Sequence, residues 1–174
     1  IFAIGDVAGG MLLAHKASRE GIVCAEVIAN KKSSFDTTII PAVVFTDPEI
    51  ACVGYTEVQA IEKGFDAHSA QFPFAALGKA LASGETDGFV KVVADRKTQR
   101  FLGIHIVGAE ASSLLGEASL ILEMGAVLED VALTIHAHPT LPEALMEAAE
   151  VALGHPIHVV TKSQSAKGAT AKSS

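Results

Sequence analysis

The stretch GFVKVVADRKTQRFLGIHIVG, residues 88–108, contains two β-rich runs separated by a short polar turn. Valine and phenylalanine occur in both runs and isoleucine in the second, and these residues are enriched in strands. The polar DRKTQ between the runs is short enough to join two antiparallel neighbours. The stretch therefore predicts a β-hairpin, in which Lys91 and His105 lie among otherwise apolar positions.

The sequence on both sides of this hairpin predicts more strands and several helices. Further β-rich runs are TTIIPAVVF, IACVGYT and DAHSAQF, with Pro41 and Pro48 better placed at a strand start and in a turn than inside a sheet. Helices are predicted over residues 56–64, where TEVQ offers a capping box, over 110–124, where an apolar stripe ends at Gly125, and from about 141 to 153. We therefore predict an α+β domain over residues 36–160, an antiparallel sheet with flanking helices.

The two ends of the chain differ from this central domain. IFAIGD, residues 1–6, predicts a buried strand, and residues 11–29 predict a helix with an unusually small apolar face. One strand and one helix cannot bury their own apolar faces, so we expect residues 1–35 to be the end of an α/β domain whose remainder is missing. Residues 161–174 are Ser, Thr, Ala, Gly and Lys with one Gln and no acids, which predicts a polar, flexible tail.

Composition excludes several classes of function. The formal net charge is −7 and no dense basic stripe precedes the tail, so we expect no nucleic-acid partner. No uninterrupted apolar run reaches the roughly 18 residues that a membrane span needs, so we expect no membrane partner. Cys24 and Cys52 lie far apart in apolar stretches, which favours small free thiols in a reducing compartment over a disulfide.

The stretch TIHAHPTLPEALMEAAEVALGH, residues 134–155, has two interpretations. In the first, Thr140 and Glu143 form a capping box at the start of the final helix. In the second, Glu143 holds the imidazole of His138 in one tautomer, so that His138 can move a proton. The two roles of Glu143 compete but could be shared. His136 could join His155 or His158 as a metal ligand, but no Cys or Asp lies near, and we expect no metal site.

Asp6 is a second candidate for binding. It ends an apolar run, and ligands bind at the carboxyl ends of strands in open α/β sheets, although a turn or a helix cap would explain it equally well. Gly9 and Gly10 follow, but the segment is neither a G-x-G-x-x-G motif nor a phosphate-binding P-loop.

Four segments together resemble one family. IFAIGDVAGGMLLAHKASREGIVCAEVI, PAVVFTDPEIACVGYTE, GFVKVVAD and ALTIHAHPTLPEAL are similar to the C-terminal part of pyridine nucleotide-disulfide oxidoreductases, over nearly the whole chain to about residue 160. The resemblance implies that residues 1–35 end an FAD-binding domain and that residues 36–160 form an interface domain for dimerisation. It also implies that Asp6 and the segment Leu12, Leu13, Ala14 and His15 contact FAD.

The same resemblance implies a function for the His138 region. His138 would be the acid/base histidine and Glu143 its carboxylate partner, acting on the redox disulfide of the other subunit in a homodimer. Within the family, the segments HAHPTL and LPEAL most resemble the members that oxidise dihydrolipoyl groups. Those members pass the electrons through FAD to NAD⁺. Such a protein would serve the lipoyl-bearing component of a 2-oxo acid dehydrogenase complex, in the bacterial cytoplasm rather than the mitochondrial matrix.

Two alternatives stay open. One is a glutathione-reductase-like member of the same family, and the other is a non-catalytic dimerisation or docking module. The chain has no C-x4-C pair and no G-x-G-x-x-G motif, so we expect it to bind no cofactor and to show no activity by itself, whereas the intact enzyme would use FAD and NAD.

Overall fold

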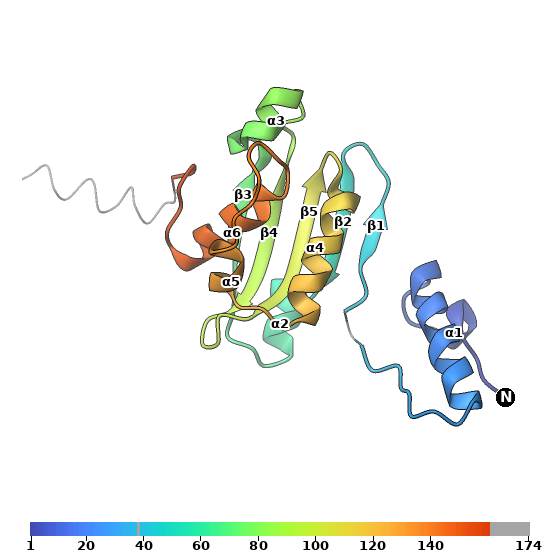
Figure 1. The fold of residues 1–174 in the computed structure, drawn as a ribbon. Coiled ribbons are helices and arrows are strands. Elements are labelled where there is room, and N and C mark those ends of the chain that lie inside the picture. The colour runs from blue at the N-terminus through green and yellow to red at the C-terminus, as the bar shows by residue number, and fades with distance from the viewer. Residues whose placement is uncertain (38, 161–174) are drawn as a thin grey trace, which may run out of the picture.

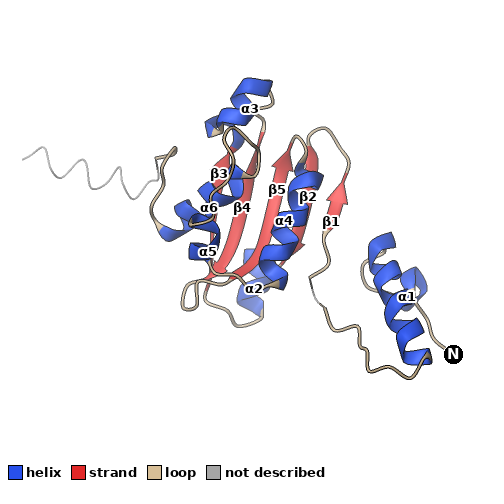
Figure 2. Cartoon of the chain, viewed as in Figure 1, coloured by secondary structure: helices blue, strands red, loops and turns tan. Residues whose placement is uncertain are grey.

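A five-stranded antiparallel sheet forms the centre of the molecule (Figure 1, Figure 2). A computed structural model describes residues 1–37 and 39–160, so the tail predicted for residues 161–174 lies outside the described part. The strand order is β1-β2-β5-β4-β3. Their bounds are Ala42–Val44 for β1, Glu49–Gly54 for β2, Ala67–Pro73 for β3, Gly88–Asp95 for β4 and Phe101–Gly108 for β5.

The predicted hairpin is confirmed and provides the middle of this sheet. β4 and β5 pair antiparallel, with Val92 opposite Ile104 and Lys91 opposite His105. Successive side chains of a strand point to opposite faces of the sheet, so the neighbouring Val92 and Val93 pack on opposite faces. Val92 belongs to the main core, whereas Val93 packs with Ala60 and Ala67 on the other face.

Two long helices cover one face of the sheet. α4 (Ala111–Glu123) packs on β2 and β5, and α6 (Glu143–Leu153) packs on β3 and β4 (Figure 1). The apolar stripe predicted for α4 is buried, and Gly125 follows the helix with a positive φ of 64°. α2 (Glu57–Glu62) contacts β3, and its predicted capping box between Thr56 and Gln59 is confirmed. The α+β prediction is therefore confirmed.

The short helices were not predicted from the sequence. They are η2 (Phe74–Ala76) and α3 (Gly78–Ser83) after β3, and α5 (Leu128–Ala132) between α4 and α6. None of the described helices is long and apolar enough to cross a membrane.

The N-terminal segment corrects one prediction. The strand expected at residues 1–6 is absent from the described structure; instead Gly5–Ala8 form a 3-10 helix, η1, before α1 (Ala14–Ile28). Ile4 still has an extended backbone, with φ −138° and ψ 160°, but it is exposed. A strand needs a neighbour to pair its backbone groups, and none of the described strands lies beside this segment.

η1 is nevertheless held firmly on α1. The buried Lys16 donates from Nζ to the carbonyl of Gly9 at 2.9 Å and contacts Glu20 at 2.7 Å. Glu20 in turn accepts the backbone N–H of Gly5 at 2.7 Å. The hydrogen bonds from Lys16 and from the Gly5 N–H lower the pKa of the Glu20 carboxyl. The division at residue 35 between two domains stays a prediction.

Candidate functional site

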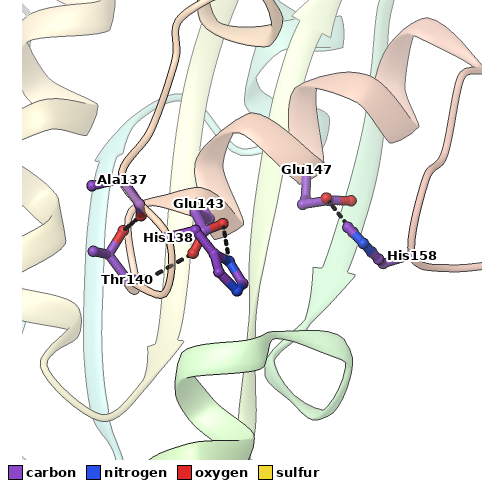
Figure 3. A network of polar contacts seen from close by, with 6 residues as sticks. All are labelled: Ala137, His138, Thr140, Glu143, Glu147 and His158. Atoms are coloured by element: carbon purple, nitrogen blue, oxygen red, sulfur yellow. Dashed lines mark hydrogen bonds and ion pairs between the residues drawn. The ribbon is translucent and has the colours of Figure 1, made fainter.

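The loop that leads into α6 brings His138 and Glu143 into contact (Figure 3). Nδ1 of His138 lies 2.9 Å from Oε1 of Glu143. The imidazole is largely exposed, with 73% of the side chain accessible, whereas Glu143 is only 14% exposed. The peptide bond between His138 and Pro139 is cis. The contact predicted between imidazole and carboxylate is therefore present.

The two oxygens of Glu143 have different partners, so the carboxylate can contact His138 and the start of α6 at the same time. Oε2 accepts the backbone N–H of Thr140 at 2.7 Å, which is one half of the predicted capping box. The other half is wrong, since the hydroxyl of Thr140 donates to the carbonyl of Ala137 at 2.6 Å instead (Figure 3). α6 therefore begins without a side-chain cap from Thr140.

Opposing effects act on the pKa of Glu143. Burial raises it, but the hydrogen bonds from the Thr140 N–H and from His138 outweigh burial and leave the pKa below its ordinary value. An ionised carboxylate only accepts hydrogen bonds, so His138 places its hydrogen on Nδ1. Nε2 is then the nitrogen left to accept or give a proton, as in other histidine–carboxylate pairs.

A hollow of about 190 Å³ adjoins this pair. Its walls are mostly apolar and come from β3, η2, α3 and the residue between η2 and α3, namely Phe72, Ala76, Leu77, Gly78 and Leu81. Two more titratable side chains, Glu147 and His158, complete the lining together with His138 and Glu143. The hollow therefore combines an apolar wall with four titratable groups.

Sequence reasoning missed the role of Glu147. Its side chain is only 3% exposed, and its Oε1 lies 2.6 Å from Nδ1 of His158 (Figure 3). Glu147 is four residues after Glu143 in a helix, which places both on one face. That spacing is a signal available in the sequence, whereas the sequence relates His158 only to a possible metal site.

His136 holds the loop to α4 rather than joining the other histidines. Its Nε2 lies 2.8 Å from Oε1 of Glu117 and its Nδ1 lies 2.9 Å from the carbonyl of Thr134. His136 and His158 thus have separate carboxylate partners. Residues 1–37 and 39–160 contain no cluster of three His, Cys, Asp or Glu side chains suited to a metal ion.

The residues expected to contact FAD lie elsewhere. Asp6 is exposed in η1, and Leu12 is exposed just before α1, which begins at Ala14. Leu13, at the N-cap, gives no side-chain hydrogen bond to the first turn of this 15-residue helix, so the first N–H groups are open to an acceptor. His15 is already engaged, with Nε2 2.7 Å from the carbonyl of Pro41. α1 lies beyond β1, away from α6 (Figure 1).

Comparison with known proteins identifies the family. Residues 40–149 match the pyridine nucleotide-disulphide oxidoreductase dimerisation domain. The chain belongs to the pyridine nucleotide-disulphide oxidoreductase family. It is 59% identical over 162 residues to the dihydrolipoyl dehydrogenase of Halobacterium salinarum and 57% identical over 162 residues to that of Geobacillus stearothermophilus. Each match covers 93% of this chain but 34% of the relative, so the chain spans about a third of these family members.

Solved structures of the family agree with the fold. LpdA of Mycobacterium tuberculosis superposes with a TM-score of 0.80 at 27% identity, covering 87% of this chain and 33% of that one. The HOCl-induced flavoprotein disulfide reductase RclA of Escherichia coli superposes with a TM-score of 0.79 at 28% identity, covering 86% of this chain and 35% of that one.

Proposed function

We propose that this chain is the dimerisation portion of a dihydrolipoyl dehydrogenase and that His138 and Glu143 are its acid–base pair. The observation that carries the proposal is the 2.9 Å contact between Nδ1 of His138 and Oε1 of Glu143, which leaves Nε2 on an exposed ring. Relatives with 59% and 57% identity are dihydrolipoyl dehydrogenases, which supports this activity over others in the family.

In this proposal, His138 takes the proton from a dihydrolipoyl thiol. A free thiol has a pKa of about 8.5, so most of it is protonated near neutral pH. Nε2 of His138 accepts the proton, and the thiolate attacks one sulfur of the redox disulfide while the other sulfur leaves as a thiolate. Glu143 stabilises the imidazolium that forms. General-base help of this kind is typically worth about 100-fold to 10,000-fold in rate.

The residues around η1 and the start of α1 fit an FAD site. Asp6 is exposed and can accept a hydroxyl hydrogen bond, and the uncapped first turn of α1 offers backbone N–H groups to an acceptor. When bound, FAD supplies the two-electron transfer between thiols and NAD⁺. The redox disulfide and the NAD site come from outside residues 1–174, because Cys24 and Cys52 are free cysteines and form no C-x4-C pair.

A second subunit completes the site. Glu117 and Leu120 lie three residues apart in α4, and Met124 follows four residues later, so all three share one face. Leu120 and Met124 are exposed, as are Leu133 and Ile135 just before His136, which contacts Glu117. An exposed apolar surface next to the His138 loop supports a homodimer whose partner subunit brings its disulfide to His138.

Two further assignments complete the proposal. A lipoyl-bearing component of a 2-oxo acid dehydrogenase complex presents the substrate to the dimer. The similar enzymes named above come from an archaeon and a bacterium, which have no mitochondria, and this favours the cytoplasm.

One observation favours a second candidate, a non-catalytic dimerisation module. Oε2 of Glu143 stabilises the start of α6 through Thr140, so Glu143 has a structural role whether or not it supports catalysis. The two candidates differ in what they predict for His138, which is exposed and donates to nothing but Glu143 among the described residues.

The deciding experiment replaces His138 in the full-length polypeptide. His138→Gln is expected to lower kcat for NAD⁺-dependent oxidation of dihydrolipoamide by about 100-fold or more, with flavin content and dimer mass unchanged. His155→Gln, at another exposed histidine, serves as the control. Normal turnover in His138→Gln with normal flavin content would leave only the non-catalytic module.

A further inference from the structure

Glu147 is a buried carboxyl with a single hydrogen-bond partner. Its Oε1 receives Nδ1–H of His158 at 2.6 Å, whereas its Oε2 is buried and has no partner within the described residues. Taking a carboxylate out of water is unfavourable unless donors replace the lost solvation. His158 is therefore the one described group that compensates this burial directly.

Glu147 also stands next to the proposed acid–base pair. It lies one helical turn after Glu143, on the same face of α6, and both side chains line the same hollow. Like charges four residues apart in a helix destabilise each other, and each raises the pKa of its neighbour. An uncompensated Glu147 would thus make Glu143 a poorer anion and would alter proton uptake at His138.

We propose that His158 is a positioning residue that keeps the charge of Glu147 from acting on the His138–Glu143 pair. With a hydrogen on Nδ1, His158 donates to Oε1 of Glu147, and in its protonated form it also offsets the charge of that carboxylate. The contact also draws the segment after α6 back to the hollow, because His158 is eleven residues beyond Glu147 and past the turn at Gly154. The inference rests on the acid–base role proposed above for His138 and Glu143.

Other charged groups around α6 have different partners or places. In β3, His68 lies 3.4 Å from the carbonyl of Ala152, at the far end of α6, and in β4, Lys91 pairs with Glu57. Lys79 of α3 lines a separate hollow beside Thr140. Glu129 of α5 lines a third hollow, which lies between α5 and α6, and Asp130 accepts the backbone N–H of Val127. Besides Thr140 and His138, His136 is the neighbour that lowers the pKa of Glu143.

The chain offers matched controls for this pair. Glu150 is on the same helix as Glu147, and His155, like His158, follows α6. Glu150 and His155 line the hollow between α5 and α6, not the one beside His138. Glu150→Gln and His155→Asn therefore make the same chemical changes away from the acid–base pair.

The test measures kcat/KM for dihydrolipoamide against pH in the full-length enzyme. His158→Asn is expected to move the acidic limb of the profile to higher pH by about half a unit, a loss of about 3-fold in rate on that limb, because the uncompensated Glu147 raises the pKa of the neighbouring groups. Glu147→Gln/His158→Asn is expected to return the limb to the position of the unchanged enzyme, because the disturbing charge is gone.

A purely structural role for His158 predicts a different pattern. It would lower rate or stability at every pH, and removal of Glu147 would not restore either. An unshifted acidic limb in His158→Asn, or a shift that the double variant keeps, would overturn the inference. His138→Gln, assayed in parallel, separates the two proposals. Normal turnover in His138→Gln would refute the acid–base role itself. Loss of turnover in His138→Gln together with an unshifted acidic limb in His158→Asn would refute only the role of His158.

Discussion

Gly78 of α3 lies directly against the imidazole of His138. A Cβ placed on Gly78 would come within 3.2 Å of Cε1 and 3.9 Å of Nε2. Such a distance to Cε1 is tighter than ordinary van der Waals contact, so the exposed ring would have to move by a few tenths of an ångström. The absence of a side chain at Gly78 therefore allows the ring the position in which Nδ1 meets Glu143.

Gly78→Ala is expected to lower kcat of the full-length enzyme several-fold with little change in KM for NAD⁺. The physical reason is misplacement of Nε2, since a displacement of about 1 Å at a reacting group can cost about 100-fold and this shift is smaller. Steady-state kinetics checks the prediction. Ala82→Ser, at an exposed position of the same short helix, is the control and is expected to leave kcat unchanged.

Glu143 should stabilise the fold in a pH-dependent way. Its pKa in the folded chain lies below the ordinary 4.5, so the stabilisation is fully present above that value and is lost as the pH falls through the lower folded-state pKa. Glu143→Gln is therefore expected to lower the free energy of unfolding of residues 1–174 by about 1 kcal/mol at pH 7. Urea unfolding at several pH values measures it.

The pH dependence provides the internal control for Glu143→Gln. The difference from the unchanged chain should start to shrink below pH 4.5, where the unfolded state takes up the proton, and its ionic part should be gone below the lower folded-state pKa. A difference that stays constant down to pH 3 would mean that the ionised carboxylate makes no special contribution and that only the shape of the side chain matters.

The elements that pattern alone predicted correctly are those that bury one face of their own. The hairpin of β4 and β5 and the stripe of α4 repeat with the periods of a strand and a helix, and both are confirmed. Residues 1–6 have the same apolar character, but none of the described strands lies beside them, so the strand predicted from this local pattern is wrong. The pattern shows which side chains are apolar; it does not show whether a neighbour is present to cover them or to pair with their backbone.

In the candidate site, only the contact between residues close together in the sequence could be predicted. His138 and Glu143 are five residues apart around a proline, so their contact could be inferred, and the two uses of Glu143 proved compatible because a carboxylate has two oxygens. The contact between Glu147 and His158 depends on where the chain turns after Gly154. The approach of Gly78 to His138 depends on α3, which sequence analysis did not detect.

Lys16 should be required for flavin binding in the full-length polypeptide. Its ammonium joins the carbonyl of Gly9 to Glu20, and Glu20 holds the N–H of Gly5, so η1 depends on this buried pair. Lys16→Met leaves Glu20 without its cation and is expected to lower the ratio of visible flavin absorbance to protein. Lys31→Met, at an exposed position after α1, should keep the full ratio.

Association should depend on the apolar side chains next to the His138 loop. Ile135 is 97% exposed and Leu133 is 73% exposed, which is costly unless a second subunit covers them. In a two-fold dimer each substitution acts twice, so Ile135→Asp is expected to convert a dimer of residues 1–174 into a monomer at micromolar concentration. Sedimentation across a dilution series measures the mass, and visible absorbance of the same sample is expected to show no flavin.

The matched control for Ile135→Asp is Val58→Asp. Val58 is 66% exposed and lies on α2, the helix that contacts β3. Val58→Asp introduces the same charge without touching the proposed surface, so it should leave the dimer intact. Circular dichroism should be equal for both variants, because neither side chain contributes to the core. If both variants dissociate the dimer equally, net charge controls association. If the unchanged chain of residues 1–174 is itself a monomer, the dimer needs residues outside 1–174.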